Sequence, residues 1–177
     1  MRIEQVAFPG IHVIDVDRRH DERGHFSRTF CRDTFRSAGL VHDFAQWSVS
    51  LNRQRGTIRG LHFQKPPHAE TKLVRVTRGA IFDVALDIRP NAPTYGQWMS
   101  IELSAENGRQ IYIPEGFAHG FQTLLDDTEI EYAISTPYAP GSSAGYRCDD
   151  PAFAITWPLP VRAISEKDAS WPDFPDH

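Results

Sequence analysis

The chain has few of the residues that build disulfide-linked or membrane-spanning proteins. Two cysteines, Cys31 and Cys148, occur among 177 residues, and thiols so far apart in sequence form neither a disulfide framework nor a zinc ribbon. No uninterrupted apolar run approaches the roughly 18 to 20 residues that a transmembrane helix needs, so we expect no membrane insertion. The start of the chain lacks the apolar stretch of a secretory signal, and we therefore expect a cytoplasmic location.

The chain also lacks an excess of basic charge. Nineteen basic residues against 23 acidic ones give a formal net charge of -4, which disfavours a nucleic-acid partner. Sixteen of the basic residues are arginines, and nine of these lie between Arg18 and Arg59. In the simplest interpretation, most of these arginines lie on a solvated surface. The planar fork of arginine also suits a few of them to hold a phosphate-bearing small molecule.

Glycine and proline, by contrast, are plentiful. Twelve glycines and 13 prolines interrupt short segments in which apolar and polar residues alternate, which is typical of an all-β domain. The clearest strand is 80–88, where Val84 lies on one face and Asp83 on the other. Further strands are expected at 13–17, 25–30, 46–52, 72–77, 97–103, 109–113 and 129–135. This number of strands around one core predicts a sandwich or barrel, formed by one domain over residues 1–177.

Helix is scarce. The pattern predicts about two turns at 32–38, ended by Gly39 in a left-handed conformation. A second short helix is expected at 165–169, capped by Ser165 because Asp168 follows three positions later. The proline-rich segment 157–177 is expected to lie over the sheet surface and to dock through Trp157 and Trp171.

One stretch with residues suited to chemistry runs from Gly56 to Gln64, and Lys72 follows on the next expected strand. Strict alternation places Arg59 opposite His62, although the glycines permit a bulge that turns both the same way. A single histidine is more often a hydrogen-bonded structural residue than a catalyst. Arginine, lysine and histidine on neighbouring strands of a small barrel nevertheless converge on one mouth.

A second stretch matches the spacing of the second cupin motif: a glycine, five residues, Pro114, one residue, Gly116, two residues and His119. This spacing predicts a double-stranded β-helix, the cupin-type jelly-roll barrel, with short peripheral helices. Metal cupins add two histidines one residue apart and a glutamate from the first motif. Here Gln64 occupies the place of the second histidine, and His68 lies in a loop, so we expect no metal.

Taken together, several stretches resemble the dTDP-4-dehydrorhamnose 3,5-epimerase family in order and spacing. They include residues 21–26, 56–64, 72–74, 82–84, 114–121 and 165–168, and the pairing of Arg-Gly-Leu-His with Gly-Phe-Ala-His-Gly-Phe is the most specific feature. The resemblance implies a cofactor-free cupin enzyme, usually a homodimer. Such an enzyme inverts C3, C5 or both in a nucleotide-linked 4-keto-6-deoxyhexose, with dTDP-4-dehydro-6-deoxyglucose as the expected substrate and dTDP-4-dehydrorhamnose as the product.

The resemblance also implies roles for individual residues. A ketone at C4 acidifies the hydrogens on C3 and C5, so inversion needs a base, an acid and a group that holds the enolate oxygen. By resemblance His62 is the base, Asp168 orients it, Lys72 stabilises the enolate and Tyr132 donates the proton. Tyr138 resembles the aromatic residue that stacks on the nucleotide base. The further implied substrate contacts are Arg23, Phe26, Arg28, Gln46, Ser48, Arg59, Asp83, His119 and Lys167.

Two departures concern recognition of the nucleotide. Arg28 stands where the family usually has a glutamate, and Ser143 stands near the place of another. These changes leave the nucleotide and the number of inverted centres open, so a mono-epimerase acting on a different nucleotide sugar remains an alternative. Two other hypotheses are a sugar-nucleotide-binding cupin without turnover and, less favoured, a metal-dependent oxygenase that uses His62, His68 and His119.

Overall fold

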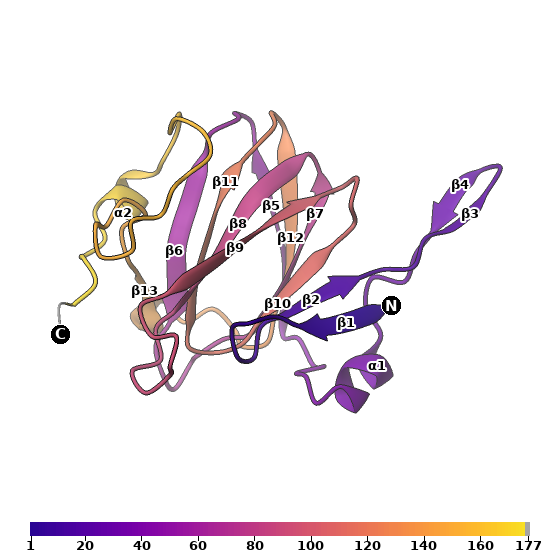
Figure 1. Cartoon of the computed structure of the whole chain (residues 1–177), viewed down its shortest axis with the longest axis horizontal. Coiled ribbons are helices and arrows are strands. Elements are labelled where there is room, and N and C mark those ends of the chain that lie inside the picture. The colour runs from indigo at the N-terminus through magenta and orange to yellow at the C-terminus, as the bar shows by residue number, and fades with distance from the viewer. Residues whose placement is uncertain (176–177) are drawn as a thin grey trace.

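The computed structural model describes residues 1–175 and shows two β-sheets packed face to face, as the sequence predicts for a jelly-roll barrel (Figure 1). One sheet contains six strands in the order β1 (Arg2–Gln5), β2 (His12–Asp15), β10 (Gln110–Ile113), β7 (Lys72–Arg78), β12 (Thr128–Ile134) and β5 (Gln46–Asn52). The other contains five in the order β13 (Ser143–Gly145), β6 (Ile58–Gln64), β11 (Phe117–Thr123), β8 (Ala80–Asp87) and β9 (Trp98–Ser104).

The main core lies between these sheets. Val74 and Ile130 of the six-stranded sheet pack with Ile81, Ala85 and Phe121 of the five-stranded sheet, and all five are buried. Burial of a large apolar side chain contributes about 1.5 to 3 kcal/mol, so these inward faces hold the sheets together.

Strand β8 is buried on both faces. Val84 and Leu86 point outward, where Phe153 and Phe174 of the C-terminal segment cover them. Asp83 lies on the inner side of β8 and is fully buried. The predicted alternation is therefore correct, and the face that carries Asp83 points into the barrel.

The short helices occur where they were expected. Helix α1 (Arg32–Ser37) is followed by Gly39 with φ +72°, and it buries Phe35. Helix α2 (Glu166–Ala169) begins after Ser165, whose hydroxyl accepts a 3.0 Å hydrogen bond from the Asp168 backbone N–H. A further turn of 3-10 helix spans Pro140–Ser142. No helix within residues 1–175 is long and apolar enough to cross a membrane.

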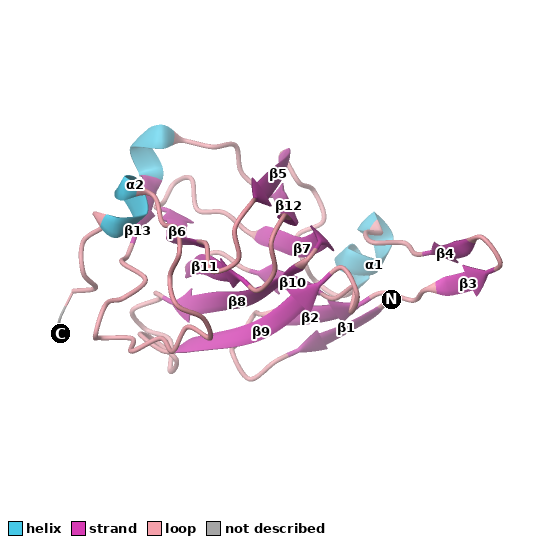
Figure 2. Cartoon of the chain, turned by 90° about the horizontal axis from the view of Figure 1, so that it is seen from above, coloured by secondary structure: helices cyan, strands magenta, loops and turns pink. Residues whose placement is uncertain are grey.

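The C-terminal segment lies along the outer face of the five-stranded sheet. Trp157 packs edge-on against Phe82, and Trp171 lies edge-on to His62 with ring centroids 6.4 Å apart. Both predicted tryptophan contacts are confirmed, while residues 176 and 177 of the predicted segment lie outside the described residues. The segment thus brings α2 to the edge of the barrel near β6 (Figure 2).

A hairpin of β3 (Arg19–Asp21) and β4 (Gly24–Phe26) projects away from the barrel (Figures 1 and 2). Its two strands pair only with each other, through three residue pairs. The strand expected at 25–30 therefore ends at Phe26, because no neighbouring strand continues the ladder before the chain turns toward α1.

Candidate active site

A cleft of about 340 Å³ opens between the two sheets, near the edge formed by β5 and β6. Nine of the 14 residues predicted for the site line this cleft, although they come from five strands and two loops or helices. These nine are Gln46, Ser48, Arg59, His62, Lys72, His119, Tyr132, Tyr138 and Lys167. Asp168 and Asp83 lie directly behind the cleft, hydrogen-bonded to two of its histidines.

An irregularity in β6 turns both Arg59 and His62 toward the cleft. His119 of β11 lies opposite His62, and Phe121 lies opposite Arg59, so β6 has one extra residue between these two pairs. The strands approach closely there, because a Cβ on Gly60 would lie 2.5 Å from the Gly120 Cα. The bulge that the glycines permitted therefore exists, and it places a guanidinium and an imidazole on the same side.

The His62 imidazole is held by a buried carboxylate. Its Nε2 lies 2.6 Å from Asp168 Oδ1, and Asp168 also accepts hydrogen bonds from the Gly60 N–H at 3.2 Å and Trp171 Nε1 at 3.3 Å. Burial works against ionisation of Asp168, but its hydrogen bonds and the attraction to His62 outweigh that effect and lower its pKa. The carboxylate is therefore ionised at neutral pH, and it is placed to orient the ring and to stabilise its protonated form.

Lys72, the first residue of β7, brings an ammonium group into the same cleft. Its Nζ donates to the His62 carbonyl oxygen at 3.2 Å and forms an ion pair with Glu70 Oε1 at 3.0 Å. Both side chains of this pair are 11% exposed. Two short-range contacts thus fix the ammonium beside the backbone of His62.

Tyr132 of β12 supplies a phenol that stays protonated. Burial, reinforced by the negative charge of Asp83, raises its pKa well above the ordinary value. The ring of His119 lies edge-on to Tyr132 with centroids 6.4 Å apart, and His119 Nε2 is 2.8 Å from Asp83 Oδ2. A second carboxylate–histidine pair therefore stands beside the phenol, fully inside the barrel.

Groups suited to a nucleotide diphosphate line the outer part of the cleft. Tyr138 exposes 57% of its surface, and its backbone N–H is held by Gln46 Oε1 at 2.6 Å. Arg59 also lines the cleft, and its Nε donates to Asn52 Oδ1 at 2.7 Å. Lys167 Nζ lies 5.2 Å from the centroid of the Trp171 ring.

Three predicted contacts lie elsewhere in the chain. Arg23 is paired with Asp21 on the projecting hairpin, and Phe26 at its base is 67% exposed. Arg28 lines a different hollow, next to Cys31. None of the three lines the cleft of its own chain. Arg23 and Phe26 belong to a hairpin that extends away from the barrel, and Arg28 follows that hairpin.

The cleft also contains residues that the sequence analysis did not assign to the site, notably Glu70, Gln64 and Ser50. Ser50 lies two positions after Ser48 on β5, so strand parity is a signal for it. Gln64 fixes the loop at Ala139, whose N–H donates to its Oε1 at 2.7 Å. Glu70 lies just before β7, outside any strand, so no periodic pattern in the sequence identifies it.

The third histidine of the oxygenase hypothesis is directed elsewhere. His68 Nδ1 is 3.1 Å from the Ser142 hydroxyl, and His68 does not line the cleft. Among residues 1–175, no three or more His, Cys, Asp or Glu side chains are grouped so that they would hold a metal ion.

The barrel and its cleft define a cupin-type enzyme. The model of the dTDP-4-dehydrorhamnose 3,5-epimerase family matches residues 5–176, and the chain belongs to this family. A dTDP-4-dehydrorhamnose 3,5-epimerase of Sinorhizobium fredii is 47% identical and covers 98% of this chain and 90% of its own.

Two solved structures are similar throughout. The enzyme from Legionella pneumophila in complex with dTDP-4-keto-L-rhamnose has a TM-score of 0.90, 39% identity and coverage of 96% of this chain and 90% of its own. A 3'-monoepimerase from Streptomyces bikiniensis in complex with dTDP-quinovose has a TM-score of 0.89, 30% identity and coverage of 95% and 85%. The same fold is thus shared by enzymes described as 3,5-epimerases and as 3'-monoepimerases.

Proposed function

We propose that the cleft epimerises a nucleotide-linked 4-keto-6-deoxyhexose at C3, C5 or both, with dTDP-4-dehydro-6-deoxyglucose as substrate and dTDP-4-dehydrorhamnose as product. The observation that carries the proposal is the meeting of a carboxylate-held imidazole, a protonated phenol and an ammonium in one cleft. These are the base, the acid and the oxyanion-stabilising group that inversion next to a ketone requires.

In the proposed reaction, His62 removes the proton from the carbon next to the C4 ketone. The electron pair moves toward C4, and Lys72 stabilises the negative oxygen of the enolate. Tyr132 then donates its proton to the other face of that carbon, which inverts the centre. Solvent exchange returns His62 and Tyr132 to their starting states, so the cycle balances without an oxidant or a reductant.

The substrate assignment rests on the relatives and on the outer cleft. Both structural relatives named above were solved with dTDP-sugars. Arg59 and Lys167 supply the positive charge that a diphosphate needs, and exposed Tyr138 offers a ring on which a base stacks. Ser143 lines the cleft near Tyr138 and offers a hydroxyl in place of a carboxylate. A cytoplasmic location remains part of this proposal.

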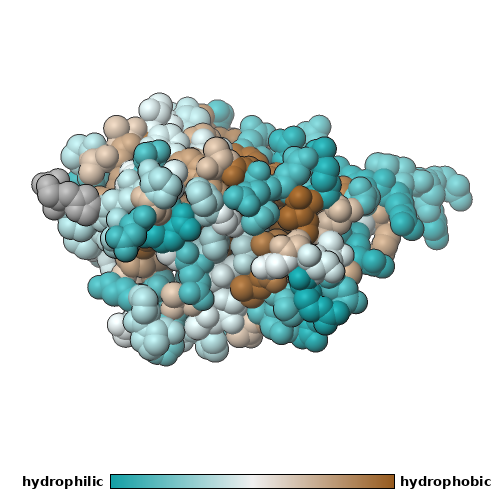
Figure 3. All heavy atoms as spheres, turned by 60° about the horizontal axis from the view of Figure 1, so that its bottom comes forward, coloured by the Kyte–Doolittle hydropathy of each residue, from teal (hydrophilic) through white to brown (hydrophobic). Residues whose placement is uncertain are grey.

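We also propose that the protein acts as a homodimer in which the β3–β4 hairpin reaches the partner's cleft. Arg23 and Phe26 have no role in their own cleft, and the hairpin extends beyond the barrel. Edge strand β5 exposes Trp47 (54%) and Val49 (62%), an apolar surface of the kind that a partner covers. Figure 3 shows a largely hydrophilic hairpin with hydrophobic atoms gathered on the body beside its base.

The decisive experiment supplies nucleotide 4-keto-6-deoxyhexoses in deuterated water. We expect deuterium at C3, C5 or both, and we expect His62→Ala to lose about 10²- to 10⁴-fold in exchange rate. Testing dTDP-, GDP-, CDP- and UDP-linked sugars identifies the nucleotide. Tight binding of a sugar nucleotide without any exchange would instead establish a binding protein. Sedimentation of the wild type and of Trp47→Glu tests the dimer, which the added charge should dissociate.

A further inference from the structure

A second hollow, separate from the cleft, lies at the start of β6. It has a volume of about 600 Å³ and is lined by residues 54–56, Asp126, Leu159, Pro160 and Arg162. It shares no lining residue with the catalytic cleft. Its size falls within the range of roughly 300 to 1,000 Å³ that small-molecule sites occupy.

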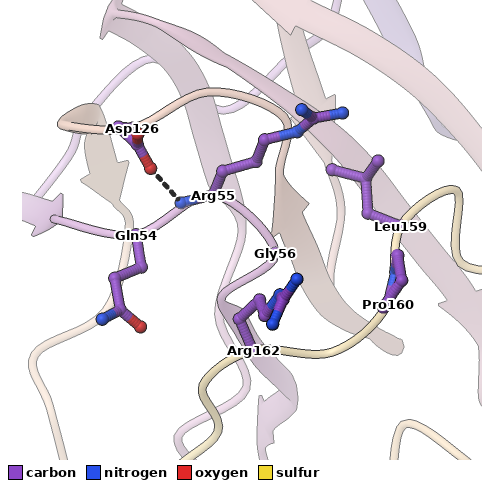
Figure 4. A pocket seen from close by; sticks show the side chains of 7 residues that line it. All are labelled: Gln54, Arg55, Gly56, Asp126, Leu159, Pro160 and Arg162. Carbon is purple, nitrogen blue, oxygen red and sulfur yellow. Dashed lines mark hydrogen bonds between the residues drawn. The ribbon is translucent and has the colours of Figure 1, made fainter.

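The side chains of Arg55 and Arg162 reach into this hollow from two sides, with the chain at Leu159 and Pro160 forming a wall (Figure 4). Within residues 1–175, neither guanidinium forms a hydrogen bond or an ion pair. This distinguishes them from most other arginines of the chain, such as Arg75, Arg89 and Arg147, which pair with carboxylates. Two guanidiniums thus face one hollow with their donors unused.

Four backbone donors around the hollow are already satisfied. The Arg55 N–H donates to Asp126 Oδ1 at 2.7 Å, and the Gly56 N–H donates to the Thr123 carbonyl at 2.8 Å. The Leu159 N–H donates to Gln122 Oε1 at 2.9 Å, and the Arg162 N–H donates to the Gly56 carbonyl at 2.9 Å. These four donors are therefore taken, and the two guanidiniums are the positively charged donors that line the hollow.

From these observations we infer that the hollow binds the phosphate groups of a small metabolite between Arg55 and Arg162. Each guanidinium presents five N–H donors in a rigid fork, and phosphate oxygens accept in a geometry that matches this fork. The Asp126 carboxylate opposes an anion, but two guanidiniums against one carboxylate leave the rim with a surplus positive charge. A diphosphate, with oxygens at both ends, suits two arginines on opposite sides.

The hollow is built from the same two segments that carry the proposed catalytic pair. Ile58 N–H donates to the Ala163 carbonyl at 2.9 Å, so the segment ending at Ala163 runs along the start of β6. Gly56 permits this approach, since a Cβ there would lie 2.7 Å from the Pro160 carbonyl oxygen. A ligand that ties Arg55 to Arg162 therefore holds together the strand of His62 and the chain that leads to Asp168. This last consequence for catalysis rests on the proposed function, whereas the binding itself does not.

Calorimetric titration of the whole protein with inorganic diphosphate in about 0.15 M salt tests the site, since salt at that level screens weak surface contacts. We expect Arg55→Gln and Arg162→Gln each to weaken one binding event by at least about tenfold, because hydrogen bonds to charged groups contribute roughly 1.5 to 3 kcal/mol. Asp126→Asn should tighten the same event. Arg53→Gln, on the same loop but outside the lining, is the matched control and should change nothing.

A further variant distinguishes diphosphate binding at the catalytic cleft from diphosphate binding in the hollow. Arg59→Gln should weaken only the event that belongs to the cleft. The inference is overturned if the Arg55 and Arg162 variants bind diphosphate as the wild type does, if every event disappears with Arg59→Gln, or if succinate binds the hollow as tightly as diphosphate. Hydrogen–deuterium exchange should slow over residues 55–60 and 159–163 when diphosphate is added, even in an Arg59→Gln background. That readout is independent of epimerase activity.

Discussion

Replacement of Asp168 by asparagine is the sharpest test of the proposed catalytic pair. The carboxylate accepts from His62 and Trp171 on one oxygen and from the Gly60 N–H on the other. An amide has only one acceptor oxygen, so its NH₂ group must face either the imidazole or the Gly60 N–H. The variant therefore loses a charge-assisted hydrogen bond, about 1.5 to 3 kcal/mol, and leaves a buried donor without an acceptor, about 1 to 3 kcal/mol.

Only the first loss grows as the imidazole takes up a proton, so it alone raises the barrier: about 1.5 to 3 kcal/mol corresponds to roughly 10- to 10²-fold in rate. The unpaired donor instead lowers the free energy of unfolding. The assay is deuterium incorporation into the sugar at saturating substrate, which follows proton removal directly. Trp171→Phe is the matched control, because it removes only the 3.3 Å hydrogen bond and should lose less than about tenfold. If Asp168→Asn exchanges at a rate close to that of Trp171→Phe, the carboxylate does not support the base and the reasoning is wrong.

The same variant has a distinct pH signature in stability. The pKa of Asp168 is lowered in the folded protein, so its contribution to the free energy of unfolding is fully present above the unfolded pKa near 3.9. That contribution is lost as the pH falls through the lower, folded-state pKa. The stability difference between wild type and Asp168→Asn should therefore be constant from about pH 5 to 8 and shrink in strong acid, as measured by denaturant unfolding.

Three further predictions concern neighbouring groups. Tyr132→Phe should retain deuterium exchange but lose at least about 10²-fold in the rate of inversion, because only the proton donor is removed. NMR of the sugar measures exchange and inversion separately. Equal loss of both rates would contradict the role assigned to Tyr132. Glu70→Gln should lose less than about tenfold in kcat, since Lys72 keeps its hydrogen bond to the His62 carbonyl. Lys72→Met should lose at least about 10²-fold in kcat, because it removes the ammonium itself. Equal kcat values for the two variants would refute the role assigned to Lys72. Gly60→Ala should lower the free energy of unfolding by more than about 2 kcal/mol, because φ is +122° and the new Cβ would meet Gly120; an unchanged denaturation midpoint would show that the strands move apart freely.

Much of the fold was predictable because strand signals are local. The strand expected at 46–52 is β5 itself, and that expected at 80–88 differs from β8 by one residue. Alternation also gave the correct faces of β8. Alternation alone does not say which face points inward, and it was the family resemblance that placed Asp83 in the site. Its pairing with His119 had no local signal, because that pairing depends on two strands meeting across 36 residues of sequence.

The cleft was predictable in part, for a similar reason. His62 and His119 were identified by motif, and the register of β6 and β11 places them opposite each other. Whether Arg59 shares their side depended on a bulge that the glycines allow but do not require. Glu70 had no signal, since a carboxylate just before a strand is most often an exposed one. The substrate contacts assigned to the hairpin do not line the cleft of their own chain, and no local pattern in the sequence indicates where the hairpin extends.

The position of Asp168 late in the chain has a consequence for the synthesis of the protein. Its partner His62 is translated 106 residues earlier, so a growing chain carries an imidazole with no carboxylate beside it. The barrel strands all precede α2 in the chain, and the ribosome therefore releases the scaffold before the residue that completes it. On the proposed mechanism, proteolytic cleavage between Ala163 and Asp168 would take the carboxylate away from His62 and abolish deuterium exchange.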